Sequence, residues 1–139
     1  LHAKFEHLIE SAPHEKGAAL PQKGVYLFSE NGRAFYVGRS NNIPQRRRQH
    51  TLRCSQTNQA ALAALMARAE TKRKVDYRKG ARERLLQDQE FMDAFRRAKE
   101  RVRAMEFRAV AEPDQTRQAL LEIYCAITLK TPHNDFGVH

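Results

Sequence analysis

The apolar residues of the chain follow two kinds of pattern. VRAMEFRAV, at residues 102–110, alternates apolar and polar side chains, which indicates a strand with one buried face. Residues 23–29 and 33–39 are rich in β-branched and aromatic residues and flank the turn signal Glu30-Asn31-Gly32. These stretches predict a β-hairpin and a third strand.

The length of the hairpin turn decides which face of the sheet each tyrosine occupies. A two-residue turn of Asn31 and Gly32 would place Tyr26 and Tyr36 on opposite faces. A three-residue turn that includes Glu30 would put the two tyrosines directly opposite each other. Asn-Gly suits both turns, and we expect the three-residue turn, because only that register lets the tyrosines work together.

Other stretches have helical patterns. A short amphipathic segment, FEHLIESA, lies near the start of the chain and is followed by a loop. Longer stretches with helix propensity or an apolar stripe predict helices at residues 43–53, 56–71, 80–101 and 114–129. With a length suited to one domain, this order of elements predicts an α+β fold, a small, mainly antiparallel three-stranded sheet flanked by helices.

The helix that follows the hairpin has a basic face. Asn41 and Asn42 are candidate caps for its first turn. Arg46, His50 and Arg53 recur at helical spacing and are expected to project from the same side.

The charge balance favours a polyanionic partner. The 139 residues include 25 Lys and Arg against 16 Asp and Glu, a formal net charge of +9. Such a field attracts nucleic acid first and an acidic membrane surface second. Between Arg68 and Arg108, fourteen basic residues accompany eight acidic ones, and two interpretations stay open: a solvated helical surface or an arm that faces phosphates.

Cysteine use and hydropathy point to the cell interior. Cys54 and Cys125 stand far apart, with no metal-ligand spacing, and fit a reducing compartment. No apolar run reaches the roughly 20 residues needed to span a bilayer. No signal peptide opens the sequence, which begins with Leu1, and we expect a cytoplasmic protein without a membrane partner.

Glu122 is the most informative single residue. It is the only charge in ALLEIYCAITL, residues 119–129, a stretch so apolar that we expect its helix to be buried on most sides. A buried carboxylate must be protonated, paired with a cation or bound to a metal ion. Two interpretations stay open: an internal salt bridge to an arginine, or a single ligand for a divalent ion such as Mg²⁺.

The hairpin glycines indicate a second part of the same site. Gly24 and Gly38 lie two residues outside Tyr26 and Tyr36. Glycine weakens a strand unless another group approaches the backbone closely or the strand bends. Together with the basic face of the next helix, the tyrosines and glycines form a candidate constellation.

This ordered set resembles the motifs of the GIY-YIG endonuclease superfamily, which includes homing endonucleases, some restriction enzymes and the incision domain of the bacterial nucleotide excision repair nuclease. The similarity covers roughly residues 22–53 and 102–136. Successive motif positions are separated by ten, ten and four residues in the first part and by twelve in the second. They are Gly24-Val25-Tyr26, Tyr36-Val37-Gly38, Arg46, His50, Glu122 and Asn134.

The resemblance implies hydrolysis of DNA phosphodiester bonds with one divalent ion, Mg²⁺ or Mn²⁺. Glu122 resembles the sole protein ligand of that metal. Tyr26 resembles the tyrosine that activates or positions the attacking water, and Tyr36 supports it. Arg46 is similar to the arginine that contacts the scissile phosphate, and His50 falls near the nucleophile. Because cations favour a phenolate, we expect the surrounding arginines and the metal to lower the pKa of Tyr26.

Four further residues complete the expected site. Asn134 resembles the residue that ties the last helix and loop together near the site. Arg39, directly after Tyr36-Val37-Gly38, is expected to contact a phosphate or a catalytic group. Arg47 and Arg53 are further candidates for substrate binding.

The distance between the two motif regions departs from the family pattern. Seventy-two residues separate His50 from Glu122, more than in compact members, so residues 54–101 form a basic helical insertion in the single domain. This insertion could grip duplex or branched DNA through its phosphates. Two alternatives remain: a nucleic-acid-binding module that does no chemistry, and a structural protein in which Glu122 pairs with Arg46.

Overall fold

The computed structural model describes residues 1–134, so the last two residues of the expected similarity, 135 and 136, lie outside it. The chain divides into two compact units. The sheet unit comprises Leu1–Arg47 and the described residues from Met105 onward, and the helical unit comprises Arg48–Ala104. The helical unit contains the expected insertion 54–101 and starts earlier, within a helix that both units share.

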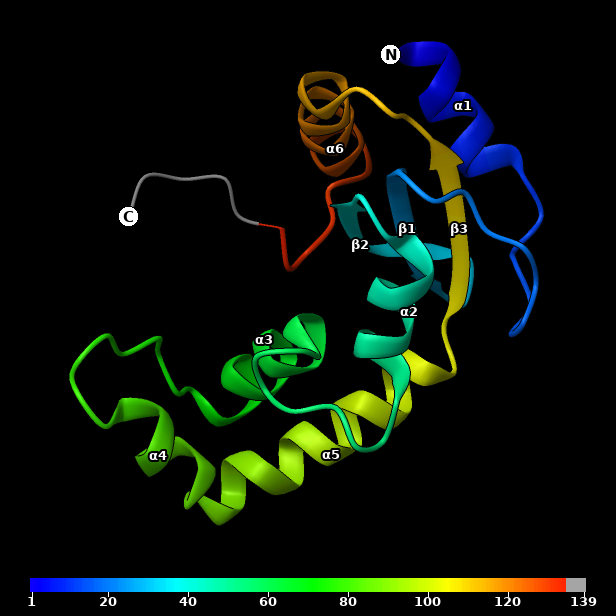
Figure 1. The fold of residues 1–139 in the computed structure, drawn as a ribbon. Helices are drawn as coiled ribbons and strands as arrows, with labels where there is room; N and C mark the ends of the chain where they lie inside the picture. Colours follow the sequence, from blue (N-terminus) through cyan, green and yellow to red (C-terminus); the bar gives the residue numbers. More distant parts are fainter. Residues whose placement is uncertain (135–139) are drawn as a thin grey trace. The chain divides into compact units, whose positions relative to one another are not determined.

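The sheet unit contains three antiparallel strands in the order β2-β1-β3 (Figure 1). β1 (Gly24–Glu30) is central, with β2 (Arg33–Ser40) on one side and β3 (Glu106–Ala111) on the other. With the surrounding helices this arrangement confirms the predicted α+β class.

The hairpin register differs from the predicted one. Glu30 pairs with Arg33 across a two-residue turn whose residues, Asn31 and Gly32, both have positive φ, of 52° and 76°. This is the turn geometry that Asn-Gly favours in tight hairpins. The three-residue turn was therefore wrong.

A β-bulge in the hairpin nevertheless places Tyr26 and Tyr36 on the same face of the sheet. The pairing shifts between Phe28 and Ser29, so that Phe28 lies opposite Tyr36 and Tyr26 lies opposite Gly38. A bulge inserts one extra residue in a strand, so the side chains beyond it point to the opposite face of the sheet from the one they would otherwise occupy. Tyr26 and Tyr36 consequently share one face of the sheet as diagonal neighbours and are not directly opposite each other.

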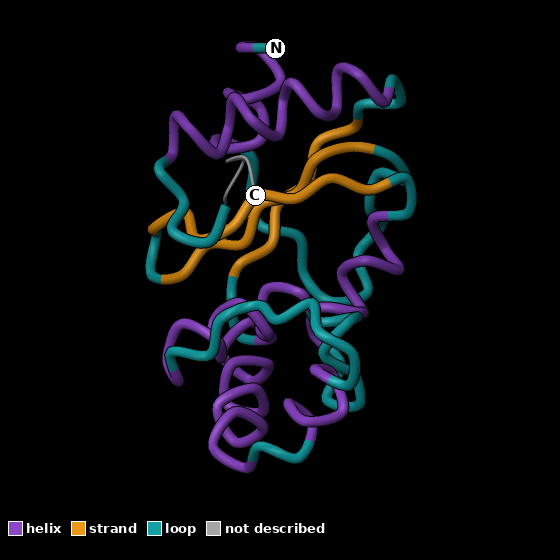
Figure 2. Tube along the Cα trace, turned by 90° about the vertical axis from the view of Figure 1, so that its left-hand side faces the viewer, coloured by secondary structure: helices purple, strands orange, loops and turns teal. Residues whose placement is uncertain are grey.

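The other face of the sheet holds a hydrophobic core cluster. α1 (His2–Glu10) and α6 (Gln115–Leu129) both pack there, and Figure 2 shows these helices above the orange strands. Asp114 caps α6, because its side chain accepts a hydrogen bond from the main-chain N–H of Arg117. The buried cluster is made of Phe5, Leu8, Val25, Leu27, Val37, Val110, Leu121, Cys125 and Ala126.

The expectation that α6 is buried on most sides was wrong. Leu120, Ile123 and Ile127 are exposed, Ile127 to 67 %. The helix lies across one face of a small sheet, so only the side carrying Leu121 and Cys125 is covered. Glu122 therefore lies at the margin of the core.

α2 (Ile43–Thr51) follows the hairpin and spans the division between the units. Asn42 caps it, since its Oδ1 accepts a hydrogen bond from the Gln45 N–H at 3.2 Å. The helix ends at Thr51, two residues earlier than predicted. Arg53 lies beyond its end, and the shared face predicted with Arg46 and His50 does not include it.

The rest of the helical unit contains α3 (Ala61–Thr71), α4 (Ala81–Leu86) and α5 (Gln89–Arg103). The single helix predicted at 80–101 is broken because Asp88 starts a new helix, its side chain accepting from the Phe91 N–H. The buried Lys99 side chain donates to the carbonyls of Arg53 and Ser55, at 2.6 and 2.9 Å, and so fixes the segment before α3. Among the described helices, none is long and apolar enough to cross a membrane.

Candidate active site

Tyr26 lies at the centre of the second face of the sheet. Its ring stacks on Phe107 of β3 with centroids 5.6 Å apart and meets Phe28 edge-on at 6.0 Å. Only 1 % of the residue is exposed. The strand pattern places these aromatic side chains at alternate positions, and their packing fixes where the Tyr26 hydroxyl lies.

Gly24 and Gly38 each lie where a larger side chain would collide with another group, and the group differs between them. A Cβ atom at Gly38 would lie 2.3 Å from both Cζ and the hydroxyl oxygen of Tyr26, so the phenol lies directly against this glycine. A Cβ atom at Gly24 would lie 1.9 Å from the main-chain oxygen of Val110. The close approach predicted from sequence is therefore present, to a tyrosine ring in one case and to β3 in the other.

Arg46 and Tyr36 complete the polar end of this face. The Arg46 guanidinium donates a hydrogen bond to the Tyr26 hydroxyl, and its charge also acts on Tyr36. Burial raises the pKa of Tyr26 well above its ordinary value, and the neighbouring Tyr36 raises it further, while Arg46 only partly opposes this. Burial likewise raises the pKa of Tyr36.

Arg46 lowers the pKa of Tyr26, as expected, but burial raises it by more, so the net pKa in the protein alone lies above the ordinary value. Desolvation of the ring against Phe107 and Phe28 outweighs one cation. At neutral pH Tyr26 is a neutral phenol, which can orient a water molecule through its hydroxyl oxygen.

Glu122 is a half-buried carboxylate on α6, with 19 % of its side chain exposed. Burial raises its pKa, and Arg39 opposes the shift through its charge and a hydrogen bond from its main-chain N–H. The Glu122 charge also perturbs both Tyr26 and Tyr36. Tyr26 of β1 and Tyr36 of β2 thus lie within electrostatic range of both Arg46 of α2 and Glu122 of α6.

Glu122 forms a salt bridge with Arg39, as one of the two interpretations predicted. The Arg39 Nε atom lies 3.8 Å from Oε1 of Glu122, an ion-pair distance that is too long for a hydrogen bond. Arg46, which the structural alternative paired with Glu122, instead contacts Tyr26. The long ion pair and the main-chain hydrogen bond, both from Arg39, are the contacts shown for the Glu122 carboxylate.

The donor chemistry at Glu122 fits one divalent ion. In residues 1–134 no group of three or more His, Cys, Asp and Glu residues could enclose a metal. Mg²⁺ often binds through one or two carboxylates and completes its shell with water and phosphate oxygens. A single partly exposed carboxylate beside an arginine is compatible with that mode.

Asn134 lies against the outer edge of β2. The Val37 N–H donates to Oδ1 of Asn134 at 2.9 Å, and Nδ2 of Asn134 donates to the Val37 carbonyl at 2.7 Å. The Thr131 hydroxyl also donates to Oδ1, at 2.7 Å. The Asn134 amide therefore acts like one residue of an additional strand and holds the segment after α6 beside the hairpin.

Replacing Asn134 by Asp is expected to destabilise the protein by about 1–3 kcal/mol, because a carboxylate cannot donate to the Val37 carbonyl. Urea unfolding followed by circular dichroism measures this effect. Asn42→Asp is the matched control. Asn42 caps α2 by accepting a hydrogen bond through its side-chain oxygen, and an Asp carboxylate can accept the same bond. Equal stability of Asn134→Asp and the parent would contradict the assigned hydrogen bonds.

Arg47, Arg53 and His50, the remaining candidate residues, are bound by protein groups or buried within the protein. Arg47 donates to the carbonyls of His14 and Glu15 and lies 4.5 Å from the ring centroid of Phe107, so its guanidinium holds a loop of the sheet unit. Arg53 pairs with Glu100 at 2.8 Å within the helical unit. His50 belongs to the helical unit and is fully buried. Their contacts with a substrate stay predictions.

Comparison of the chain with protein-family models, with curated proteins and with solved structures gave no match. The contribution of Phe107 to the site was missed from the sequence, although the alternating pattern of residues 102–110 already placed it on a buried face.

Proposed function

We propose that this chain is a metal-dependent endonuclease of the GIY-YIG type that hydrolyses DNA phosphodiester bonds. The observation that carries the proposal is that Tyr26 and Tyr36 share one face of the sheet and that the charges of both Arg46 and Glu122 act on each of them. Duplex or branched DNA is the proposed substrate, and a cytoplasmic location belongs to the same proposal.

The chain's own residues would position the reactants. Hydrolysis forms a bond between water oxygen and phosphorus while the bond to the leaving sugar oxygen breaks. That oxygen takes up a proton, and the attacking water loses one to solvent. Arg46 offsets phosphate charge, and Tyr26, held by Arg46 and Phe107, orients the water with its hydroxyl oxygen.

Glu122 would hold the divalent ion, with Arg39 giving up its loose contact or turning to a phosphate. A bound Mg²⁺ or Mn²⁺ would polarise the phosphate and neutralise part of its charge. The pKa of Glu122 is raised by burial, and a cation at this carboxylate would oppose that effect by favouring the charged form.

A plasmid nicking assay tests the proposal. The protein is incubated with supercoiled plasmid and Mg²⁺ or Mn²⁺, and a parallel reaction contains excess EDTA. Conversion to the open-circular or linear form only with the metal supports the endonuclease. DNA retention in a gel-shift assay without nicking under any metal condition would overturn it.

The burial of Tyr26 and the Arg39–Glu122 pair favour one other candidate, a nucleic-acid-binding module without catalysis. In that case Tyr26 and the Arg39–Glu122 pair would only stabilise the fold. The module would bind DNA in the gel-shift assay with equal affinity in Mg²⁺ and in EDTA, whereas an endonuclease that uses Glu122 would leave nicked product only in Mg²⁺.

A further inference from the structure

The helical unit contains a basic hollow of its own, whose lining includes none of the motif residues. It has a volume of about 700 Å³ and is lined by α3, α4 and the loop between them, by Thr57 and Asn58 before α3, and by Asp88 at the start of α5. Leu65 and Leu85 are among its apolar lining residues. Its cationic lining residues are Arg68, Lys72, Arg73, Lys74, Arg82 and Arg84.

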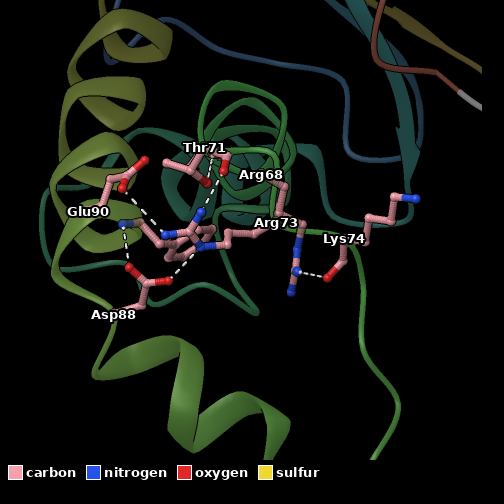
Figure 3. A network of polar contacts seen from close by, with 8 residues as sticks. Arg68, Thr71, Arg73, Lys74, Asp88 and Glu90 are labelled. Atoms are coloured by element: carbon pink, nitrogen blue, oxygen red, sulfur yellow. Dashed lines mark hydrogen bonds and ion pairs between the residues drawn. The ribbon is translucent and has the colours of Figure 1, made fainter.

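The acidic residues of the hollow are already neutralised. Asp88 accepts a hydrogen bond from Arg73 at 2.7 Å, and Asp76 pairs with Arg78 at 2.8 Å and with Arg84 at 3.7 Å. Figure 3 shows Arg73 held between Asp88 and Glu90. These carboxylates are therefore occupied, and they do not cancel the other cations.

Four cations of the lining keep their charge available. Arg68 donates to the main-chain carbonyl of Lys74 at 3.0 Å, a neutral partner (Figure 3). Arg82 donates to the side-chain oxygens of Gln56 and Asn58, which are neutral partners. Within the described part of the chain, the exposed side chains of Lys72 and Lys74 have no hydrogen bond or ion pair. A polyanion would gain charge-assisted contacts here without first breaking a carboxylate pair.

An exposed aromatic residue follows the hollow in the same loop. Tyr77 comes directly after the lining residue Asp76 and is 89 % exposed. The loop sequence around it, TKRKVDYRKG, surrounds the ring with basic residues. Binding surfaces for unpaired nucleic acid combine a basic groove with aromatic rings on which bases stack.

We propose that the hollow of the helical unit is a second nucleic-acid site, which holds the sugar-phosphate backbone of a single-stranded segment while Tyr77 stacks on an unpaired base. An acidic protein segment would use the cations but leave the exposed ring without a partner. The site needs none of Tyr26, Arg46 or Glu122, so it goes beyond the proposed hydrolysis and does not depend on it.

Fluorescence anisotropy tests this site on the full chain carrying Glu122→Gln, in EDTA, so that cleavage cannot interfere. The probes are a short fluorescein-labelled oligodeoxythymidylate and a blunt duplex. Replacing Lys72 and Lys74 by Gln is expected to weaken single-strand binding at least about tenfold at low salt and to reduce the slope of log K against log salt by about 1.4, since each single-strand phosphate contact contributes about 0.7.

The matched control replaces Arg96 and Arg97 by Gln, which removes the same charge from α5 outside the hollow. Equal weakening by the two double variants would mean that only net charge matters and would overturn the site. Circular dichroism melting of each variant verifies that the helical unit is folded.

Tyr77 gives a second and independent readout. Tyr77→Ala is expected to weaken single-strand binding about tenfold and duplex binding little, while Tyr77→Phe keeps the stacking surface and the affinity. Unchanged single-strand affinity in Tyr77→Ala, with polyglutamate displacing the probe as well as unlabelled oligonucleotide does, would overturn the proposal in favour of an acidic protein partner. Failure of plasmid nicking with intact single-strand binding would reject only the endonuclease.

Discussion

Glu122→Gln is expected to reduce the rate of plasmid nicking at least about 100-fold, because an amide oxygen is a much weaker ligand for a divalent ion and carries no charge. The substitution keeps the size of the side chain and its position on α6. The measurement is the initial rate of open-circle formation in Mg²⁺, with gel-shift affinity for the same DNA measured in EDTA.

The same variant is expected to be at least as stable as the parent at neutral pH. Burial raises the pKa of Glu122 in the folded protein, so folding favours the protonated carboxyl. The stabilisation from this group is greatest below its unfolded pKa and falls as pH rises toward the folded pKa. Above that range the charged carboxylate is a cost, which Gln removes. A residue that lowers stability in this way is typical of a functional site.

Glu106→Gln provides the control, since Glu106 is an exposed glutamate at the start of β3. It removes one negative charge from the same unit and is expected to leave the nicking rate within about twofold, because an exposed charge acts weakly at a distance. Full activity of Glu122→Gln would show that the metal ligand lies elsewhere. Loss of activity together with a lower melting temperature would assign Glu122 to the fold.

The strands and the glycine positions could be predicted because local chemistry decides them. Asn31 and Gly32 tolerate positive φ, and Gly24 and Gly38 are costly in a strand without a close neighbour. The turn length and the bulge could not be predicted, since Asn-Gly suits both turns. In the folded protein Tyr26 and Phe28 pack against Phe107, a residue far away in sequence, and a local pattern does not contain that contact.

The electrostatic state of the site could not be predicted for a related reason. The sequence places Arg46 near Tyr26, and a nearby cation alone would lower the pKa of the phenol. The opposite direction follows from desolvation, which depends on the rings packed around Tyr26 in the folded protein. For α6, a helical wheel counts apolar residues, but the width of the sheet decides how many of them are covered, so Leu120 and Ile127 stay exposed.

Gly24→Ala is expected to destabilise the protein by about 3 kcal/mol or more, since overpacking against an immovable group is among the largest effects of a single substitution. The new Cβ would lie 1.9 Å from the oxygen and 3.0 Å from the carbonyl carbon of Val110. Both atoms belong to the main chain of β3, so relief requires β1 and β3 to separate. Thermal unfolding should show a decrease in Tm of about 10 °C or more.

Two other glycines separate this effect from the cost of the Gly→Ala change itself. Gly17→Ala places a methyl group in open space at a φ of 81°, and only backbone strain of about 1 kcal/mol is expected. Gly38→Ala meets the end of the Tyr26 side chain, so the ring must shift away from Arg46, and we expect loss of nicking with a smaller loss of stability than in Gly24→Ala. If Gly24→Ala melts no lower than Gly17→Ala, the close approach of β3 to β1 is wrong. If Gly38→Ala keeps full activity, the position of the Tyr26 hydroxyl does not matter for hydrolysis.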